Sequence, residues 1–421
     1  MSPIHAAVLL LVSLGPGDAL ESGETITASS SSEPSRPGGA RDGERFSVEP
    51  GKLWRGLDGQ TAWWWQLDLG SLRPIGAILQ VHGDHAFVLQ NAPCDYAWEA
   101  SDDGQAWRTL AGTQVKGEER VFRLHRLPEP RRARWLRLSI ASAHGKAPVL
   151  REVEVFDSPQ ARVDFPPWCI AVNATHETAL PGHGQEFIPL ARSAPGWERL
   201  EAQQVLLKTV REDFLRVEPR PLCAFISGSF KDWCEVDRSA WRGLEEVLKA
   251  GRLPIWASCG GAQGLAILSD TGADKPWDCP HCRDSKNPRT PIYGHIGHTA
   301  SCPCGDYSGC IFERGLHTVR QAAKDPAFQG LEAEFQVMES HCGQIEYAPR
   351  GWVLVTEGGP GTKTRVQCIR RADRYVYAAQ FHIEMEGARD SSRRIVGNFL
   401  RLASGWGGYN PDGLAVEPPG P

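Results

Sequence analysis

The sequence predicts two domains, an all-β sandwich followed by an α/β domain on a mostly parallel sheet. Residues 25–157 contain short runs of alternating apolar and polar residues between Gly, Pro and Asp turns, which is typical of a sandwich. Beyond residue 168, apolar runs of strand length alternate with stretches of helical periodicity, which predicts a parallel sheet with helices on both faces. Residues 158–167, with Ser-Pro and Pro-Pro pairs, are expected to form the linker.

The composition argues against one class of partner. The chain has 421 residues, which is enough to bury two separate cores. It has 46 Lys and Arg residues against 51 Asp and Glu residues, a net charge of −5, and no long basic run. Nucleic acid is therefore not an expected partner.

The N-terminus resembles an export signal. Residues 6–14, AAVLLLVSL, form an apolar run that is too short to cross a bilayer as a helix. Small residues follow at the positions that a signal peptidase reads, so we expect residues 1–19 to be a signal peptide ending at Ala19. The alternative is a buried N-terminal strand. No other stretch is apolar enough for a transmembrane helix, and the expected location is periplasmic or secreted.

The strands expected in the first domain carry a family resemblance. They cover residues 63–70, 75–81, 96–101, 135–140 and 150–156. The segments WWQLDLG, ASDDGQAW, ARWLRLSI and LREVEVF, in this order, resemble the coagulation factor 5/8 type C, or discoidin-like, domain, a galactose-binding-like jelly roll. The resemblance implies binding of sugars, phospholipids or proteins through loops at one end. We therefore expect a glycan or cell-surface ligand, the alternative being a purely structural companion domain.

One loop of this domain holds the candidate ligand contacts. It follows the second expected strand and contains His82, Gly83, Asp84, His85 and Asn91. Loops carry binding residues more often than strands do, although a solvated surface loop is the alternative for each of them.

In the second domain, strands and helices are expected to alternate up to residue 268. The expected strands cover 168–172, 222–226 and 253–257, and the expected helices cover 201–217 and 239–250, the second closed by Gly251 as a C-cap. Open α/β sheets place their sites at the carboxyl ends of the strands.

The segment 253–268, LPIWASCGGAQGLAIL, predicts a strand, a sharp turn and a helix, with Cys259 on the turn. Such a turn requires small neighbours because its backbone is tight. The dipole of the following helix favours thiolate over thiol. Cys259 is therefore a candidate nucleophile, the alternative being a small buried residue at a strand end.

A second pair of candidate residues follows the strand-like run 375–381. Residues two apart in an extended chain point to the same side, so His382 and Glu384 can face one site. The imidazole is suited to act as a base, and the carboxylate is suited to orient it.

Four segments of the second domain resemble class I glutamine amidotransferases. They are SCGGAQG and AAQFHIE around the three candidates, AFISGS at 224–229 and VMESH at 337–341, and the resemblance covers roughly residues 166–405. It implies a three-layer, flavodoxin-like domain at 168–405 whose Cys-His-Glu triad, Cys259, His382 and Glu384, cleaves the side-chain amide of glutamine. Two positions depart from the family pattern, Ala257 in place of Gly and Ile383 in place of Pro.

The same reasoning assigns supporting roles. The backbone N–H groups of Gly260 and of the Gly228–Ser229 turn are expected to stabilise the oxyanion. Gln263, Ser340 and His341 are candidate substrate-binding residues, with a partly exposed helix residue as the alternative for Gln263.

A Cys/His-rich insertion is expected at 279–310. Cys279, Cys282, Cys302 and Cys304 form two close pairs that could hold a structural zinc ion, and His295, His298 and Cys310 lie nearby. Disulfides are the alternative in an exported protein, and the sequence favours neither. Catalysis itself requires no cofactor.

The function expected from these features is that of an exported Cys-His-Glu amidohydrolase. Its small-molecule substrate would be glutamine or a γ-glutamyl-type amide, cleaved through a thioester, while the first domain binds a sugar or a surface. The chain contains no recognisable ammonia-accepting domain, which favours hydrolysis. The alternative is a non-catalytic carbohydrate- or surface-binding protein with a degenerate amidotransferase fold.

Overall fold

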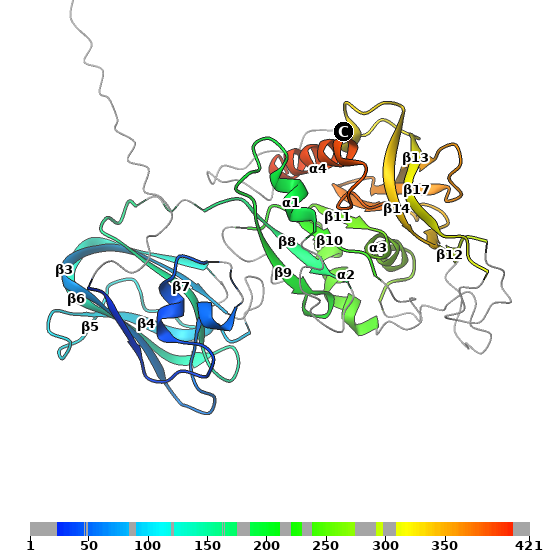
Figure 1. Ribbon diagram of the computed structural model, residues 1–421. Helices are drawn as coiled ribbons and strands as arrows, with labels where there is room; N and C mark the ends of the chain where they lie inside the picture. The colour runs from blue at the N-terminus through cyan, green and yellow to red at the C-terminus, as the bar shows by residue number, and fades with distance from the viewer. Residues whose placement is uncertain are drawn as a thin grey trace, which may run out of the picture. The chain divides into compact units, whose positions relative to one another are not determined.

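The computed structural model divides the chain into two compact units, residues 1–165 and 166–421 (Figure 1). The boundary falls inside the stretch expected to be the linker. The structure describes residues 23–45, 47, 49–83, 90–118, 122–161, 163, 165–174, 186–210, 220–229, 238–273, 292–297 and 309–406. The expected signal peptide lies outside them. Within these ranges, no helix is both long enough and apolar enough to cross a membrane.

The first unit is an antiparallel β-sandwich. Its strands are β1 (Thr25–Ala28), β2 (Trp54–Arg55), β3 (Trp63–His82), β4 (Pro93–Ser101), β5 (Arg108–Thr109), β6 (Phe122–Ala143) and β7 (Val149–Phe156). They pair in the order β2-β7-β3-β6-β4-β5, with β1 also on β3. Two short 3₁₀ helices, Pro37–Arg41 and Pro50–Lys52, accompany them.

The long strands β3 and β6 each serve both layers of the sandwich. The first part of β3, Trp63–Asp68, pairs with β1 and with the last part of β6, whereas Ala77–Val81 pairs with the start of β6 and with β7. Register shifts between Asp68 and Ala77 separate the two parts. The two strands expected at 63–70 and 75–81 are therefore one strand, interrupted by bulges that let it change layer.

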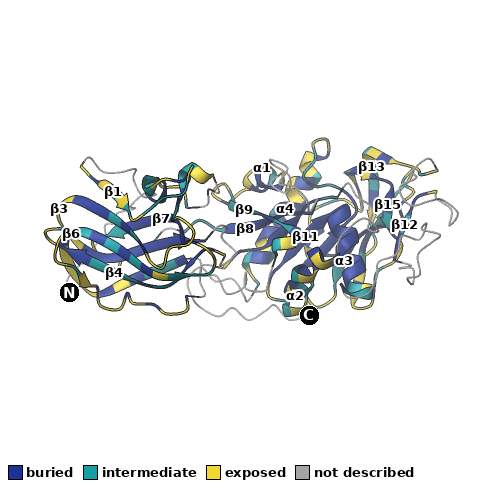
Figure 2. Cartoon of the chain, turned by 90° about the horizontal axis from the view of Figure 1, so that it is seen from below, coloured by how far each residue is buried: buried dark blue, intermediate teal, exposed yellow. Residues whose placement is uncertain are grey.

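Tryptophans fill the core between these layers. Trp54, Trp65 and Trp98 are fully buried, and the rings of Trp65 and Trp98 meet edge to face at 6.2 Å between centroids. Along the first part of β3, Trp63–Leu67, buried residues alternate with half-buried ones, and Figure 2 shows these two classes along much of the strands, as sheets with one buried face require. The alternation that predicted a sandwich is confirmed.

The second unit is built on a mixed sheet. Its order is β14-β13-β16-β17-β18-β11-β10-β8-β9. The strands are β8 (Trp168–Asn173), β9 (Glu201–Leu206), β10 (Ala224–Ile226), β11 (Ile255–Ser258), β13 (Glu313–Gln321), β14 (Glu334–His341), β16 (Trp352–Gly358), β17 (Val366–Arg371) and β18 (Val376–Ala379). A separate antiparallel pair joins β12 (Tyr293–His295) to β15 (Gly343–Ile345).

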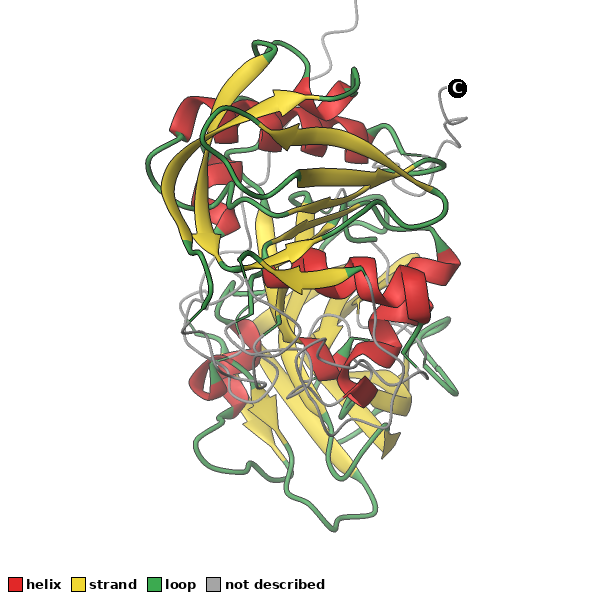
Figure 3. Ribbon diagram, turned by 90° about the vertical axis from the view of Figure 1, so that its right-hand side faces the viewer, coloured by secondary structure: helices red, strands yellow, loops and turns green. Residues whose placement is uncertain are grey.

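The expectation of a mostly parallel sheet is wrong. Strands β9, β8, β10, β11 and β18 run parallel, but β13, β14, β16 and β17 pair antiparallel with their neighbours (Figure 3). Part of the physical reason is connection length, since parallel neighbours need crossovers, whereas β16 returns to β17 through residues 359–365 and β17 returns to β18 through residues 372–375. A flavodoxin-like fold is therefore not what the structure establishes.

Helices cover both faces of the parallel half. On one face α1 (Phe187–Arg192) and α4 (Arg389–Ser404) pack onto Phe225, Trp256 and Tyr377, all fully buried. On the other, α2 (Arg242–Ala250) and α3 (Gly260–Thr271) pack beside β10 and β11 (Figure 1). The helix expected at 239–250 is confirmed, and its C-cap Gly251 has the left-handed φ of 65°.

The helix expected at 201–217 is wrong over its first part. Glu201–Leu206 is a strand, β9, which pairs with β8 along six residues and leads into a short 3₁₀ turn, Leu207–Thr209. The apolar spacing at 205, 206 and 210 fits a helix as well as a strand, and pairing with the edge of the sheet decides between them. Residues 211–217 lie outside the described ranges.

Candidate active site

Cys259 lies on the bend between β11 and α3, as the sequence predicted. Its φ of 48° and ψ of −117° place it among the few left-handed non-glycine residues of the described chain. Backbone contacts fix this strained conformation: Cys259 N–H donates to Ala379 O of β18 (2.8 Å), and Cys259 O accepts from Gln263 N–H (3.0 Å). The residue is only 7% exposed and begins the helix at the carboxyl end of β11.

Two glycines let the start of α3 approach the turn after β10. A Cβ atom at Gly260 would lie 2.4 Å from the backbone N of Ser229, and one at Gly261 would lie 2.5 Å from Ser227 O. A Cβ atom added at Gly228 would lie 3.6 Å from the Cβ of Cys259. The three candidate oxyanion residues therefore lie together beside Cys259, the candidate nucleophile.

His382 and Glu384 form the expected pair. The ring Nδ1 lies 2.5 Å from Glu384 Oε1, and both side chains are about nine-tenths buried. Since the carboxylate only accepts, Nδ1 carries the hydrogen and Nε2 is left as the basic nitrogen. Nε2 is buried and has no hydrogen-bond partner within the described residues.

The imidazole also lies beside the turn that contacts Cys259. A Cβ at Gly228 would be 3.4 Å from His382 Cε1 and 3.9 Å from Cys259 Sγ. Burial alone would lower the pKa of His382, but the charges of Glu384 and of the Cys259 thiolate raise this pKa well above its ordinary value. These charges favour the protonated form of the His382 imidazole.

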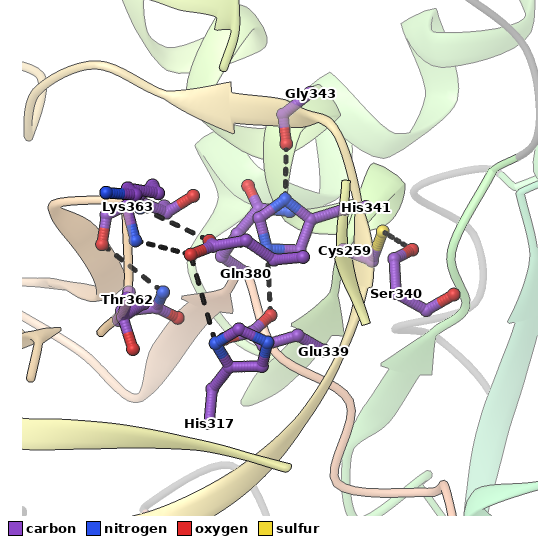
Figure 4. A network of polar contacts seen from close by, with 12 residues as sticks. Cys259, His317, Glu339, Ser340, His341, Gly343, Thr362, Lys363 and Gln380 are labelled. Atoms are coloured by element: carbon purple, nitrogen blue, oxygen red, sulfur yellow. Dashed lines mark hydrogen bonds and ion pairs between the residues drawn. The ribbon is translucent and has the colours of Figure 1, made fainter. Parts of the chain in front are cut away.

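The wall facing the thiol comes from β14 and β15 (Figure 4). Ser340 presents its backbone carbonyl 3.9 Å from Cys259 Sγ, and Met338 O accepts from the His382 N–H at 2.9 Å. Gln263, expected to bind substrate, donates from its side chain to Gly343 O (2.9 Å) and to Gln380 Oε1 (3.3 Å). The side-chain amide of Gln263 thus links α3 to β15 by a hydrogen bond.

The sequence reading missed two acidic residues beside His341. His341 Nε2 lies 2.8 Å from Glu339 Oε2 and 3.7 Å from Glu313 Oε2, and all three side chains are at least 98% buried. Two signals were available: Glu339 and His341 are two apart on one strand, and Glu313 stands opposite His341 in the β13–β14 register. The second signal could be read only with the pairing of β13 and β14 known, and the sequence alone does not give that pairing.

The expected zinc ligands fall outside the part of the chain that the structure describes. These are Cys279, Cys282, Cys302 and Cys304, together with the nearby His298. Of their neighbours, His295 is buried with its Nε2 2.8 Å from the Tyr293 hydroxyl, and Cys310 is half-buried. Among the described residues, no group of three or more His, Cys, Asp or Glu side chains is arranged so that it could hold a metal ion.

The loop residues expected to contact a ligand in the first unit are largely structural. His82 is fully buried, with its Nδ1 2.9 Å from the Gln80 amide, and Gly83 is buried too. Asn91, 4% exposed at φ 61°, accepts from Lys146 N–H through Oδ1 (3.2 Å). The expectation of surface contacts is wrong for these three because their polar groups hold the loop to the sandwich, and Asp84 and His85 lie outside the described residues.

Comparison with known proteins supports the two halves unequally. Residues 25–155 match the F5/8 type C domain, so this part of the chain is a domain of that type. The second half shows a weaker, partial similarity to curated GMP synthases of the glutamine-hydrolysing kind. One from Thermosipho africanus is 35% identical over 69 residues, 16% of this chain and 13% of that protein. One from Thermus thermophilus is 34% identical over 92 residues, 22% of this chain and 18% of that protein. The chain thus matches less than a fifth of either relative's length.

Each half also has similar solved structures. A GMP synthase-type protein from Thermoplasma acidophilum covers 57% of this chain and 96% of its own, with 16% identity and a TM-score of 0.41. A family 32 carbohydrate-binding module from Clostridium perfringens, solved with galactose, covers 32% of this chain and 96% of its own, with 16% identity and a TM-score of 0.28.

Proposed function

We propose that the second unit is a thiol-dependent amidohydrolase acting on glutamine or a γ-glutamyl-type amide. The observation that carries the proposal is the arrangement of Cys259, His382 and Glu384. A strained cysteine at a strand–helix bend has a histidine beside it whose other nitrogen is bonded to a buried carboxylate at 2.5 Å. Nucleophile, base and orienting acid in this relation are what acyl transfer requires.

The proposed reaction begins with transfer of the thiol proton to His382 Nε2. The Cys259 sulfur attacks the amide carbon, and the charge that develops on the carbonyl oxygen is stabilised by the N–H groups of Gly260 and of the Gly228–Ser229 turn. His382 then gives its proton to the departing amine or ammonia, which leaves a thioester. Water, deprotonated by the same imidazole, releases the acid and restores the thiol.

The choice of glutamine-like amides rests on two supports. The segments around the triad resemble class I glutamine amidotransferases, and the partial relatives are named as glutamine-hydrolysing enzymes. Ser340, whose backbone carbonyl faces the thiol, is the proposed substrate-side residue of the wall, with His341 buried behind it and Gln263 holding the wall to α3.

The first unit would bring this activity to a glycan or a cell-surface ligand. The support is the match of residues 25–155 to the F5/8 type C domain. Export through a signal peptide at 1–19 belongs to the same proposal, and it would place the enzyme in the periplasm or outside the cell. A structural zinc ion or disulfides at 279–304 also stay proposals.

The test is ammonia release from glutamine and from γ-glutamyl amides by the full-length protein. Cys259→Ala and His382→Gln should abolish release above background, while Cys94→Ser, a half-buried cysteine of the first unit, should retain it. Equal activity of the parent and Cys259→Ala would contradict a thiol mechanism. No release by a folded, reduced parent from any of these amides would favour the non-catalytic alternative.

A further inference from the structure

A buried acid–histidine cluster lies behind the wall that faces the thiol. It consists of Glu339 and His341 of β14 and Glu313 of β13, whose side chains are 0, 2 and 1% exposed. Because side chains alternate along a strand, Glu339 and His341 share one side of β14 and Ser340 faces the other. The reaction proposed above assigns no step to either glutamate.

The two ring nitrogens of His341 both face acceptors. Nδ1 lies 2.9 Å from Gly343 O, and a carbonyl oxygen only accepts, so Nδ1 carries a hydrogen. Nε2 lies 2.8 Å from Glu339 Oε2. With a neutral imidazole and a charged carboxylate, two unprotonated atoms that carry lone pairs would lie 2.8 Å apart. A second ring proton, on Nε2, turns this repulsion into the attraction of an ion pair.

The surroundings of Glu339 support this proton. Neither oxygen of its carboxylate has a hydrogen-bond partner within the described residues, the group is fully buried, and its Oε2 forms an ion pair with His341 Nε2 at 2.8 Å. An uncompensated charge in such a place is strongly unfavourable, and an imidazolium at His341 would neutralise it.

The other charged groups around His341 act in the same direction. Burial opposes protonation of His341, but Glu339, the Cys259 thiolate and Glu313 raise its pKa above the ordinary value. Glu313 accepts backbone N–H groups of Lys363 and Thr364 (3.2 Å for the latter), which hold its carboxylate in place. Figure 4 shows Glu339 on the opposite side of the His341 ring from Gly343.

We propose that His341, as an imidazolium in an ion pair with Glu339, and Glu339 itself are positioning residues that hold the Ser340 carbonyl against the Cys259 thiol. The His341 N–H fixes Gly343 O, which also accepts from Gln263 Nε2, so the wall is tied to the helix of the nucleophile. Loss of the Nε2 proton of His341 would leave two unprotonated acceptors 2.8 Å apart, and their repulsion would release the β14–β15 wall. The catalytic consequence rests on the proposed function, whereas the structural consequence does not.

The discriminating variant is Glu339→Gln. The new amide can donate N–H to the neutral Nε2 of His341, so the wall is held without a titrating proton. His341→Gln is the second variant, because it also lacks the titrating proton. His317→Gln is the matched control, since His317 lies on β13 and touches the cluster only through a 3.9 Å approach to Glu313.

The first readout is hydrogen–deuterium exchange of peptides covering 334–346 in the full-length protein, with all variants compared at each pH. In the parent and in His317→Gln, these peptides should lose protection at alkaline pH by about tenfold or more relative to Glu339→Gln. Parallel curves for the parent and for both Glu339→Gln and His341→Gln would overturn the inference.

The second readout is covalent labelling of Cys259 by 6-diazo-5-oxonorleucine. The labelling efficiency of the parent should fall at alkaline pH through weaker analogue binding, and that of Glu339→Gln should not. If no protein is labelled but the exchange curves differ, the proposed function fails and the positioning role stands. If labelling is identical in the parent and Glu339→Gln at every pH and the exchange curves are parallel, the function stands and the positioning role fails.

Discussion

At the scale of single residues, the tautomer of His382 decides what the candidate site can do. Glu384 Oε1 accepts a hydrogen bond from the Nδ1–H group of His382 at 2.5 Å, which leaves Nε2 free to accept the thiol proton. The residue types and the two-residue spacing were visible in the sequence. The position of the His382 ring relative to Cys259 was not visible in the sequence. It depends on the turn at Gly228, which packs against both residues although all three are far apart in the chain.

Glu384→Gln should therefore slow covalent labelling of Cys259 while leaving analogue binding nearly unchanged. An amide can offer N–H to Nδ1 and so favour the wrong tautomer, and losing a positioned base costs about 10²-fold or more in rate. The measurement is the dependence of labelling rate on analogue concentration. Glu386→Gln is the control, because Glu386 is two residues away with a side chain 86% exposed. An unchanged maximum rate in Glu384→Gln would contradict the orienting role.

A second residue-scale prediction concerns Glu152 in the first unit. Burial, followed by the neighbouring charges of Glu154 and Asp42, raises its pKa to about 8. The folded state therefore holds a proton that the unfolded chain releases near the ordinary value of 4.5, so its stability should fall as pH rises from about 4.5 to 8.

Glu152→Gln keeps the neutral form at every pH and should flatten that slope. Calorimetric unfolding of the full-length protein across the window measures it, with the exposed Glu129→Gln as the control. The same slope in Glu152→Gln as in the parent would show that another group titrates.

At the scale of elements, glycine spacing fixes how α3 packs. Gly260 and Gly261 allow contact with the β10 turn, and Gly264 lies against Trp241, whose ring would be 2.0 Å from an added Cβ. The strand–turn–helix around Cys259 was predictable because its small residues and apolar periodicity are local. Strand β9 was not, since its apolar spacing fits two periods and only the neighbour β8 selects one.

Gly264→Ala should destabilise the second unit by about 1–3 kcal/mol, because the methyl group must displace a buried indole. Gly397→Ala is the matched helical control: its Cβ would meet only Ala194 Cβ at 3.4 Å, so the gain in helix propensity, up to about 1 kcal/mol, should make it neutral or stabilising. Thermal unfolding compares the two. Equal effects would contradict the close packing of α3 on Trp241.

At the scale of the whole molecule, the described residues of each unit gather around a hydrophobic core of their own. One gathers the tryptophans of the sandwich, and the other gathers Phe225, Trp256 and Tyr377 with α1 and α4. Domain count and class followed from periodicity and from the Pro-rich stretch near residue 165. The antiparallel half of the second sheet did not follow, because strand direction depends on which edges pair, and that information is not local.

Separate cores predict that damage to one leaves the chemistry of the other intact. Trp98→Ala removes a fully buried ring whose Nε1–H donates to Gln80 Oε1 at 2.9 Å, and should destabilise the sandwich by about 3–5 kcal/mol. The rate of Cys259 labelling, measured below the new unfolding temperature, should not change. A parallel loss of labelling would contradict the independence of the two cores.

The most direct test of the central claim is the intact mass of the protein after treatment with 6-diazo-5-oxonorleucine, beside Cys259→Ala treated identically. We expect one adduct on the parent and none on the variant, with the modified residue mapped to Cys259 by peptide mass. Absence of an adduct on the folded, reduced parent, or an equal adduct on Cys259→Ala, would contradict a working thiol nucleophile in a glutamine-sized site.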